Sequence, residues 1–314
     1  MRRRFSSLVE AFRPDTVQIE QAFPYLGVRP ILDELGMRPR LVFSSHNVEH
    51  TMKREILAGA GWDAKDVEAL TGRIESLERD LAQRCDICIA VSDDDAQAHQ
   101  AMGAGNVIVA RNGASRRPSS AASERRWKAR IAARGIRHTA LFVGSAHPPN
   151  WVGFMSTVGT RLGFLAPDTC VLLAGGVADY MHEHFRGRTV DQVTMWRRLW
   201  PLGRVTDSDL AALLRVADVI LLPITEGGGS NLKTAEAILS GRPVVATDYA
   251  LRSFEDLMDL PNIHAARTPE EFRAAMLHAF SRPAGQRSAE QVRRSEAVLW
   301  ERCLEGVAEA VASL

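Results

Sequence analysis

The feature that most constrains the fold of this chain is the alternation of short apolar runs with segments long enough to form helices. Most of the apolar runs are hydrophobic on both faces, which is typical of strands in parallel sheets that helices cover on both sides. Residues 66–84 illustrate the helical partner, because their apolar residues recur at spacings of three and four. The sequence therefore predicts an α/β protein with parallel sheets. The expected strands lie at residues 15–20, 40–45, 86–91, 107–110, 139–144, 169–174, 218–223, 243–248 and 262–265.

The chain is long enough for two hydrophobic cores. It has 314 residues, of which 46% are hydrophobic, and residues 112–137 form a break rich in Ser, Gly, Pro and Arg. We expect a first domain at residues 1–115, a linker at 116–137, a second domain at 138–290, and a helix at 291–314 that packs back towards the first domain. The basic stretch around Trp127 suits a solvated linker helix, although contact with anionic lipid or a nucleic-acid backbone is the alternative.

Charge and composition exclude several classes of protein. The 39 Lys and Arg residues nearly balance the 38 Asp and Glu residues, so no overall field attracts nucleic acid. The sequence contains neither a signal-peptide core nor a run of about 20 apolar residues. We expect a cytoplasmic protein, with peripheral contact to the cytoplasmic membrane left open. Cys85 and Cys88 are expected to be structural, because positions three apart on a strand point to opposite faces.

The strongest chemical signal is the segment LLPITEGGGSNLKTAEAILSGRPVVATDYA at residues 221–250. An apolar strand ends near Pro223, a glycine loop follows, and a helix is expected to begin near Ser230 or Asn231. The N-terminus of such a helix presents free backbone N–H groups and a positive dipole, so phosphate is the expected ligand. The spacing matches neither the Walker pattern nor the G-x-G-x-x-G dinucleotide pattern.

Lys233 and Glu236 lie three residues apart on this helix. They could form a surface ion pair, but a lysine near the N-terminus and a glutamate after it is the unfavourable order for the helix dipole. We therefore favour contact with a ligand. In this interpretation Lys233 binds phosphate and Glu236 accepts hydrogen bonds from sugar hydroxyls.

These segments together resemble the fourth family of retaining GT-B glycosyltransferases, also called glycosyl transferases group 1. The resemblance is carried by EGGGSNLKTAEAILSGRPVVAT, by GRVTDSDLAALLRVADVILLP, and by LFVGSAHPPN, with HNVEHTMKREI, RCDICIAVSDDD and VARNGA in the first half. It implies two Rossmann-like domains facing a cleft, with the nucleotide-sugar donor bound by the second domain and the acceptor by the first.

The resemblance also implies roles for individual residues. Glu236 resembles the second glutamate of the family's E-x7-E signature, which binds the donor ribose, and His46 resembles a histidine that faces the transferred sugar and the acceptor. With Lys233 these are the expected catalytic residues. The expected donor-binding residues are Gly144, Ser145, Asn150, Val205, Gly227, Gly228, Gly229, Ser230, Asn231, Leu232 and Thr234.

Two positions depart from the family pattern. Gly228 stands where the first glutamate of the signature is expected, and Glu226 lies two residues away. The usual Arg and Lys after the first strand of the second domain are absent, and Ser145, His147 and Asn150 are found there instead, so Lys233 is expected to supply the missing charge. The alternative function is a catalytically weak protein that only binds nucleotide sugars.

A zinc peptidase is a second alternative, because residues 46–50 spell H-x-x-E-H. That site needs both histidines on one helix, whereas His46 is expected to follow a strand directly, so we disfavour it. The sequence SDDD at residues 92–95 has the spelling of a metal motif, but serine followed by acidic residues after a strand is typical of a helix N-cap.

The expected reaction is glycosyl transfer with retention from a nucleoside diphosphate sugar to an acceptor hydroxyl, in polysaccharide or glycolipid synthesis, without a metal or other cofactor. The base, the sugar and the acceptor cannot be read from the sequence. Only four expected strands precede the linker, so we also expect that the start of the first domain is missing and that its sheet has an unpaired edge.

Overall fold

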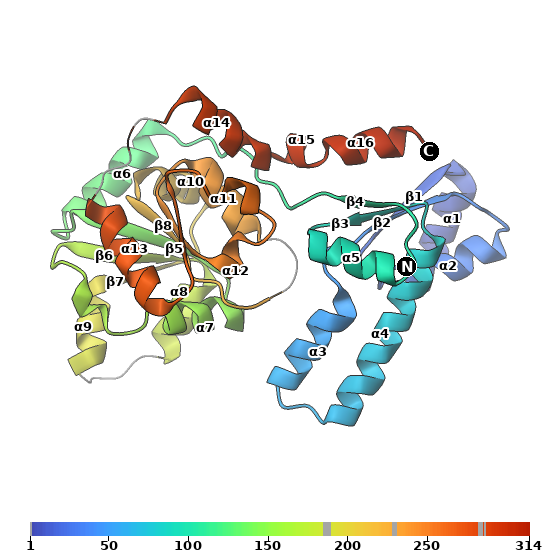
Figure 1. Cartoon of the computed structure of the whole chain (residues 1–314), viewed down its shortest axis with the longest axis horizontal. Helices are drawn as coiled ribbons and strands as arrows, with labels where there is room; N and C mark the ends of the chain where they lie inside the picture. Colours follow the sequence, from blue (N-terminus) through green and yellow to red (C-terminus); the bar gives the residue numbers. More distant parts are fainter. Residues whose placement is uncertain (1, 185–189, 228–230, 282–284, 286) are drawn as a thin grey trace. The chain divides into compact units, whose positions relative to one another are not determined.

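A computed structural model describes residues 2–184, 190–227, 231–281, 285 and 287–314 (Figure 1). The described chain forms two compact units. Among the described residues, the first contains those up to Asn112, Gly227 and Cys303–Leu314, and the second contains Gly113–Glu226 and Asn231–Arg302. None of the helices in the described part of the chain combines the length and the hydrophobicity that a membrane crossing requires.

The first unit is built on a parallel sheet of four strands in the order β1-β2-β3-β4. Its elements are α1 (Arg2–Phe12), β1 (Thr16–Glu20), α2 (Tyr25–Glu34), β2 (Arg40–Ser44), α3 (Glu49–Gly59), α4 (Ala64–Arg84), β3 (Ile87–Ala90), α5 (Asp93–Ala101), β4 (Val107–Val109) and α16 (Glu305–Ala312).

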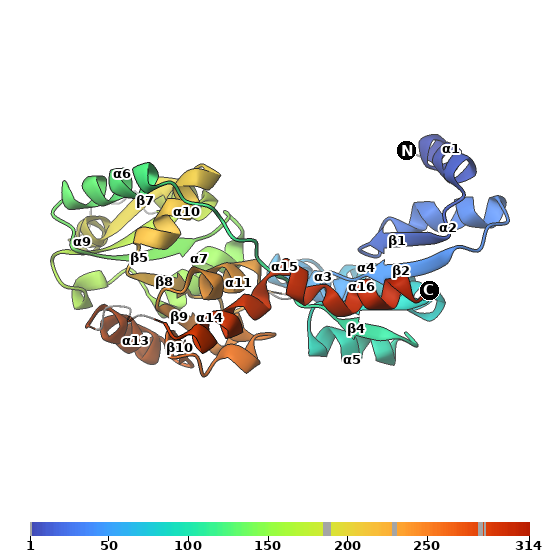
Figure 2. The ribbon, with the colours of Figure 1, turned by 90° about the horizontal axis from the view of Figure 1, so that it is seen from above.

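Side chains that alternate along the strands divide the core of this unit between the two faces of the sheet. Phe43 of β2 packs with Tyr25 of α2 and Leu81 of α4 on one face. Its neighbour Val42 faces the other side, which α16 covers with Val307 and two further small apolar residues (Figure 2). A helix about 200 residues later in the sequence therefore completes the core of the first sheet.

The second unit contains a parallel sheet of six strands in the order β10-β9-β8-β5-β6-β7. Its strands are β5 (His138–Val143), β6 (Thr169–Ala174), β7 (Leu199–Gly203), β8 (Val219–Leu222), β9 (Val244–Thr247) and β10 (Ile263–Ala266). Its helices are α6 (Ala121–Ala132), α7 (Pro148–Thr157), α8 (Gly176–His184), α9 (Val190–Arg198), α10 (Asp207–Val216), α11 (Leu232–Ser240), α12 (Asp248–Leu251), α13 (Pro269–Ser281), α14 (Ala289–Ser295) and α15 (Trp300–Cys303), with 3-10 turns at Leu162–Phe164, Glu255–Leu257 and Glu296–Val298.

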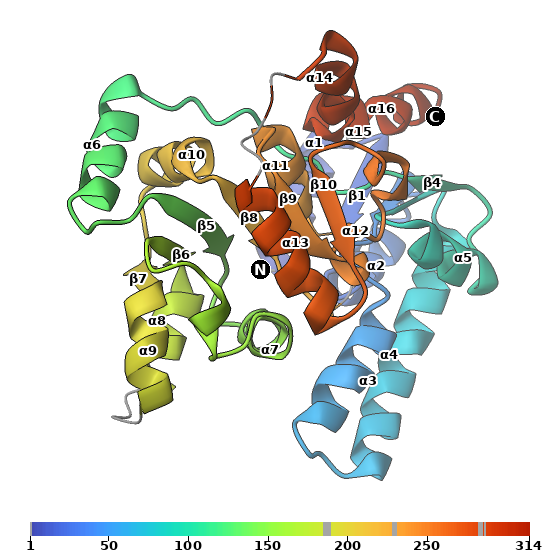
Figure 3. The ribbon, with the colours of Figure 1, turned by 60° about the vertical axis from the view of Figure 1, so that its left-hand side comes forward.

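Helices cover both faces of this second sheet, as the apolar composition of its strands predicts. Leu141 of β5 packs on the face that carries α6, α10 and α11. The next residue, Phe142, packs on the opposite face, which carries α7, α8, α9 and α13 (Figure 3). Two hydrophobic layers therefore hold the sheet, and its ends are left for the loops.

The structure confirms the α/β class and places a strand at each of the nine predicted runs. It adds one strand that the sequence does not suggest, β7, whose sequence LWPLG contains a proline and a glycine. β7 lies at the edge of the sheet and pairs only with β6, and Pro201 is tolerated there because an edge strand has one side without ladder hydrogen bonds.

Two other local expectations have different outcomes. Ser92 caps α5, since its side chain accepts a hydrogen bond from the backbone N–H of Asp95. The geometric argument about the cysteines is wrong, because Cys85 caps the end of α4 and does not lie on the strand. The thiols of Cys85 and Cys88 share a hydrogen bond, which lowers the pKa of Cys85 and, together with burial, raises the pKa of Cys88.

The predicted linker residues 116–137 contain α6, which belongs to the second unit. Trp127 is 2% exposed, and its indole N–H donates to Asp209 on α10 at 2.8 Å. The guanidinium group of Arg130 lies 4.3 Å from the centre of the Trp127 ring. The expectation of a merely solvated helix is therefore wrong, because this tryptophan anchors α6 in the core.

The close approach of α7 to the end of β8 depends on Gly153. A Cβ atom at this position would lie 2.0 Å from the carbonyl oxygen of Pro223, the residue after β8. We expect Gly153→Ala to lower the free energy of unfolding by about 1–3 kcal/mol, because α7 must shift away from the sheet. Chemical denaturation measures this change.

Gly72 is the matched control, since it lies inside α4 and has no atom within 4 Å of the position of its Cβ. Gly72→Ala should be neutral or should stabilise the protein by up to about 1 kcal/mol. Equal stability of the Gly153→Ala variant and the wild type would show that α7 does not need this contact.

Candidate functional site

The order of strands in the second sheet marks a position for a ligand. β5 and β8 are neighbours, but the chain leaves β5 towards β6 on one side and leaves β8 towards β9 on the other. Ligands of open parallel sheets bind beyond the carboxyl ends of the strands at such a switch point. The predicted Gly144–Ser145 turn follows β5, and the glycine loop follows β8. Gly228, Gly229 and Ser230 lie outside the described residues.

A hydrogen-bonded chain of side chains joins the turn after β5 to the start of α11. The amide nitrogen of Asn150, at the start of α7, donates to the backbone oxygen and to the hydroxyl of Ser145, both at 3.0 Å. The amide oxygen of Asn150 accepts a hydrogen bond from the ammonium group of Lys233 on α11. Asn150 is 5% exposed, so this amide is fixed in place. Three predicted donor-binding segments thus meet at one point.

Lys233 has an altered proton affinity. Burial disfavours its charged form and lowers its pKa to about 8, against which the nearby carboxylate of Glu236 acts in the opposite direction. Lys233 and Glu236 do not bond to each other. Lys233 contacts Asn150, and Glu236 contacts Arg117. The structure therefore does not contain the surface ion pair that was the alternative for these two residues. At pH 7 the ammonium group is charged and can bind an anion.

The N-terminus of α11 has an unused hydrogen-bond donor. Asn231 is the N-cap residue, but its side chain makes no capping hydrogen bond, and its buried amide nitrogen has no partner among the described residues. Gly227 has a φ of 116°, a conformation that side chains rarely adopt. This end of the helix therefore offers backbone and side-chain N–H groups together.

The other predicted donor-binding residues differ in exposure. Leu232 begins α11 and is 52% exposed. Val205 follows β7 and packs partly against the core. Thr234 is fully buried, and its hydroxyl donates to the backbone oxygen of Ala250 at 2.6 Å. Its side chain stabilises the packing of α11 and is not available to a ligand.

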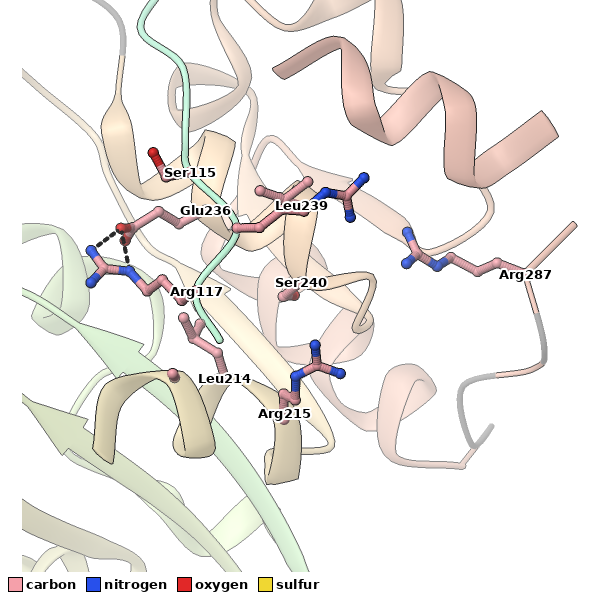
Figure 4. A pocket seen from close by; sticks show the side chains of 10 residues that line it. Ser115, Arg117, Leu214, Arg215, Glu236, Leu239, Ser240 and Arg287 are labelled. Carbon is pink, nitrogen blue, oxygen red and sulfur yellow. Dashed lines mark hydrogen bonds and ion pairs between the residues drawn. The ribbon is translucent and has the colours of Figure 1, made fainter. Parts of the chain in front are cut away.

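Glu236 is bound by an arginine that the sequence did not suggest. Nε and Nη2 of Arg117 donate to Oε1 of Glu236 at 3.1 and 2.5 Å (Figure 4). Nη1 of Arg117 donates to Asp207 at 3.1 Å. Both Arg117 and Glu236 line a pocket of about 180 Å³ between α10 and α11, with Leu214 and Leu239 among its apolar walls.

In the first unit, the predicted His46 is part of a polar group at the carboxyl ends of β1 and β2. Nε2 of His46 lies 2.9 Å from Glu20, and the side-chain amide of Gln21 donates to Nδ1 at 3.3 Å. Burial alone would raise the pKa of Glu20, but hydrogen bonds from His46, Ser44 and Gln18 outweigh it and lower the pKa. The ring of His46 is 46% exposed, so one side of it is open to a ligand.

The remainder of the HNVEH segment is structural. Glu78 of α4 is fully buried, and it accepts hydrogen bonds from the backbone N–H groups of Glu49 and His50 and from Nδ1 of His50, at 2.7, 3.0 and 2.7 Å. It therefore caps α3 and fixes His50. His46 precedes that helix, and no group of three or more His, Cys, Asp or Glu side chains in the described ranges could hold a metal ion. The zinc-peptidase geometry is absent from these residues.

Sequence reasoning missed two residues of these sites. Arg117 lies in a stretch without periodicity, and nothing there indicates that it reaches α11. Glu20 had a usable signal, because it ends a strand just as His46 follows one, and parallel neighbours bring such positions together.

Comparisons with known proteins agree with the fold. Residues 137–282 match the family model described as glycosyl transferases group 1. Over its whole length the chain superimposes on solved structures of glycosyltransferases with two Rossmann-like domains. The chain has the GT-B fold. No curated protein sequence matches it.

Three solved structures represent these GT-B neighbours. Anabaena HepE in complex with UDP is 17% identical, with a TM-score of 0.73 over 100% of this chain and 82% of HepE. Sucrose-phosphate synthase from Thermosynechococcus elongatus is 14% identical, with a TM-score of 0.73 over 99% of this chain and 76% of that one. Trehalose 6-phosphate synthase from Burkholderia multivorans is 16% identical, with a TM-score of 0.65 over 99% and 75%.

The pKa of Lys233 predicts how anion binding depends on pH. A pKa of about 8 means that the ammonium group loses its proton as the pH rises from 7 to 9. We expect the affinity for inorganic pyrophosphate to fall by up to about tenfold over this range, because a group is only about one-tenth protonated when the pH is one unit above its pKa. Isothermal titration calorimetry at several pH values measures this.

Lys233→Arg is the control, since a guanidinium group stays charged at pH 9. The affinity of this variant for pyrophosphate should change little between pH 7 and 9. A fall of the same size in wild type and variant would assign the pH dependence to another group.

Proposed function

We propose that this protein is a glycosyltransferase that moves a sugar from a nucleoside diphosphate sugar to an acceptor hydroxyl with retention of the anomeric configuration. The observation that carries the proposal is the contact of Lys233 with Asn150, which joins the start of α11 to the turn after β5. The family match of residues 137–282 supports the reaction class. The HepE neighbours were solved with UDP and with UDP-glucose, which supports a nucleotide-sugar donor.

The residues of the second unit suit the departure of a diphosphate. In the reaction, the bond between the anomeric carbon and the diphosphate oxygen breaks, and its electron pair leaves with the nucleoside diphosphate. The acceptor oxygen bonds to the same face of the carbon and gives its proton to the departing diphosphate. Lys233, the amide of Asn231 and the N-terminus of α11 would stabilise the negative charge that develops on the leaving group.

Glu236 would bind the ribose hydroxyls of the donor, and His46 would contact the transferred sugar and the acceptor. Glu236 has one oxygen available, since Arg117 occupies only Oε1. His46 has an exposed ring face and a carboxylate partner that fixes its orientation. We further propose a carbohydrate or lipid-linked acceptor and a role in polysaccharide or glycolipid synthesis in the cytoplasm.

A protein that binds nucleotide sugars without transferring them is the second candidate. It is favoured by Gly228, which stands where the family pattern has its first glutamate, and by Ser145 and Asn150, which stand where that pattern has basic residues. Turnover separates the two candidates, because a binder alone would be stabilised by the donor without releasing nucleoside diphosphate.

Ligand-dependent stability tests the donor site. We expect one of UDP, GDP and ADP to raise the melting temperature, because a ligand present at 100 times its Kd and bound only to the folded state adds about 2.7 kcal/mol. The increase should shrink in Lys233→Ala and in Glu236→Ala, as differential scanning fluorimetry can show.

Lys128→Ala is a suitable control, because Lys128 is an exposed lysine of α6 in the same unit. It should keep the full ligand-dependent increase. If none of the three nucleoside diphosphates or their sugars shifts the wild type, the donor-site assignment is wrong.

Substitution of His46 tests the other half of the site. We expect His46→Ala to reduce glycosyl transfer at least about tenfold, since a positioned group that acts on the acceptor typically contributes 10²–10⁴-fold. The increase in melting temperature caused by the nucleoside diphosphate should be unchanged, because His46 lies in the first unit, whereas Lys233 and Glu236 lie in the second.

Metal analysis accompanies this measurement. Zinc should stay at background in wild type and variant, in line with the different partners of His46 and His50. Stoichiometric zinc that is lost in His46→Ala would overturn the assignment of this histidine to a sugar site.

A further inference from the structure

We propose that Arg117 is a positioning residue of the donor site, which holds Glu236 in the orientation that recognises ribose. This inference rests on the proposed function, because it concerns the carboxylate expected to bind the donor nucleoside. It adds a residue from the segment between β4 and α6, which no sequence pattern or family match includes.

The contacts give Arg117 a fixed place. Two of its N–H groups converge on Oε1 of Glu236, at 3.1 and 2.5 Å, while Nη1 contacts Asp207 at the start of α10. The hydrogen bond to Glu236 is the main cause of the raised pKa of Arg117. A guanidinium group bridges both helices in this way because its donors form a rigid planar fork.

The same geometry leaves part of Glu236 free. A carboxylate has two oxygens and about four lone pairs, and Arg117 uses only one oxygen. In the part of the chain that the structure describes, Oε2 has no hydrogen-bond partner, and the Glu236 side chain is 24% exposed. The carboxylate can therefore accept a ribose hydroxyl while Arg117 stays bound, and the arginine removes the rotamer freedom that the ligand would otherwise have to restrict.

The backbone that carries Arg117 is also held in place. The backbone N–H of Ala114 donates to Val298 at 2.7 Å, and the N–H of Trp300 donates to Ala114 at 3.2 Å. On the other side of Arg117, the buried Trp127 fixes α6. With both flanks attached to the second unit, the side chain reaches Glu236 from an anchored segment and not from a free loop.

Binding of deoxynucleotides tests this role directly. The probe is whichever of UDP, GDP and ADP binds the wild type, compared by calorimetry with its 2′-deoxy and 3′-deoxy forms and with inorganic pyrophosphate. A hydrogen bond to a charged group contributes about tenfold or more in affinity, so the wild type should prefer the ribonucleotide over one deoxy form by about tenfold. In Arg117→Gln and Arg117→Lys this preference should fall to about threefold or less.

Two further measurements separate positioning from general stability. Affinity for pyrophosphate should be unchanged in the Arg117 variants, because pyrophosphate has no ribose. Arg294→Ala is the matched control, since Arg294 also donates two hydrogen bonds to one carboxylate, that of Asp259, and its side chain is 33% exposed against 35% for Arg117. This variant should keep the full preference for the ribonucleotide.

Other outcomes overturn the inference. Tighter ribonucleotide binding in Arg117→Gln would mean that the arginine competes with ribose, and an unchanged preference would mean that it does not act on Glu236. If the Arg117 variants lost both pyrophosphate binding and the preference for the ribonucleotide, the role of Arg117 would be purely structural. If no nucleoside diphosphate binds the wild type, the proposed function fails first, and this inference fails with it.

Discussion

The parallel pairing of every strand in both sheets is the constraint on which the rest of the structure depends. Parallel neighbours require a crossover between them, so all loops that follow strands gather at one edge of a sheet. In the second sheet the chain leaves the neighbouring strands β5 and β8 towards opposite sides, so the carboxyl ends of these two strands lie beside each other. Because Gly153 has no side chain, α7 can approach the end of β8. The polar residues at this edge are therefore positioned by the backbone arrangement.

At the candidate donor site, Lys233 has a neutral hydrogen-bond partner and Glu236 has a charged one. Asn150 is a neutral acceptor for Lys233, so it holds the ammonium group without cancelling its charge. Glu236 is instead neutralised by Arg117, which leaves a carboxylate that can accept hydrogen bonds without repelling a nearby anion. The first two turns of α11 thus have different electrostatic character, with an unneutralised cation in the first and a paired carboxylate in the second.

The sequence pattern was sufficient to predict the sheets and the helices that cover them, but it was insufficient to predict which side chains contact one another. Runs such as 169–174 are apolar throughout, and a buried strand is what such a run can form. β7 was missed because Pro201 and Gly203 are typical of a turn and argue against a central strand. They are acceptable in β7 because this strand lies at the edge of the sheet. Lys233 was recognised from its unfavourable place in the helix, but its contact with Asn150 depends on how α7 meets β8. Arg117 could not be found at all, because its partner lies 119 positions away.

The packing of α16 on the first sheet has a consequence for how the protein is made. Ala110 is in the same hydrophobic cluster as Val311, so one face of that sheet has no cover until the ribosome has produced the helix. At about 5–20 residues per second, the intervening 200 or so residues take roughly 10–40 s. During this interval the whole second unit is synthesised and can fold, while Val42 and Ile89 remain exposed to water, to chaperones and to other nascent chains. The core of the first unit is therefore completed after the core of the second, although the synthesis of the first unit begins earlier.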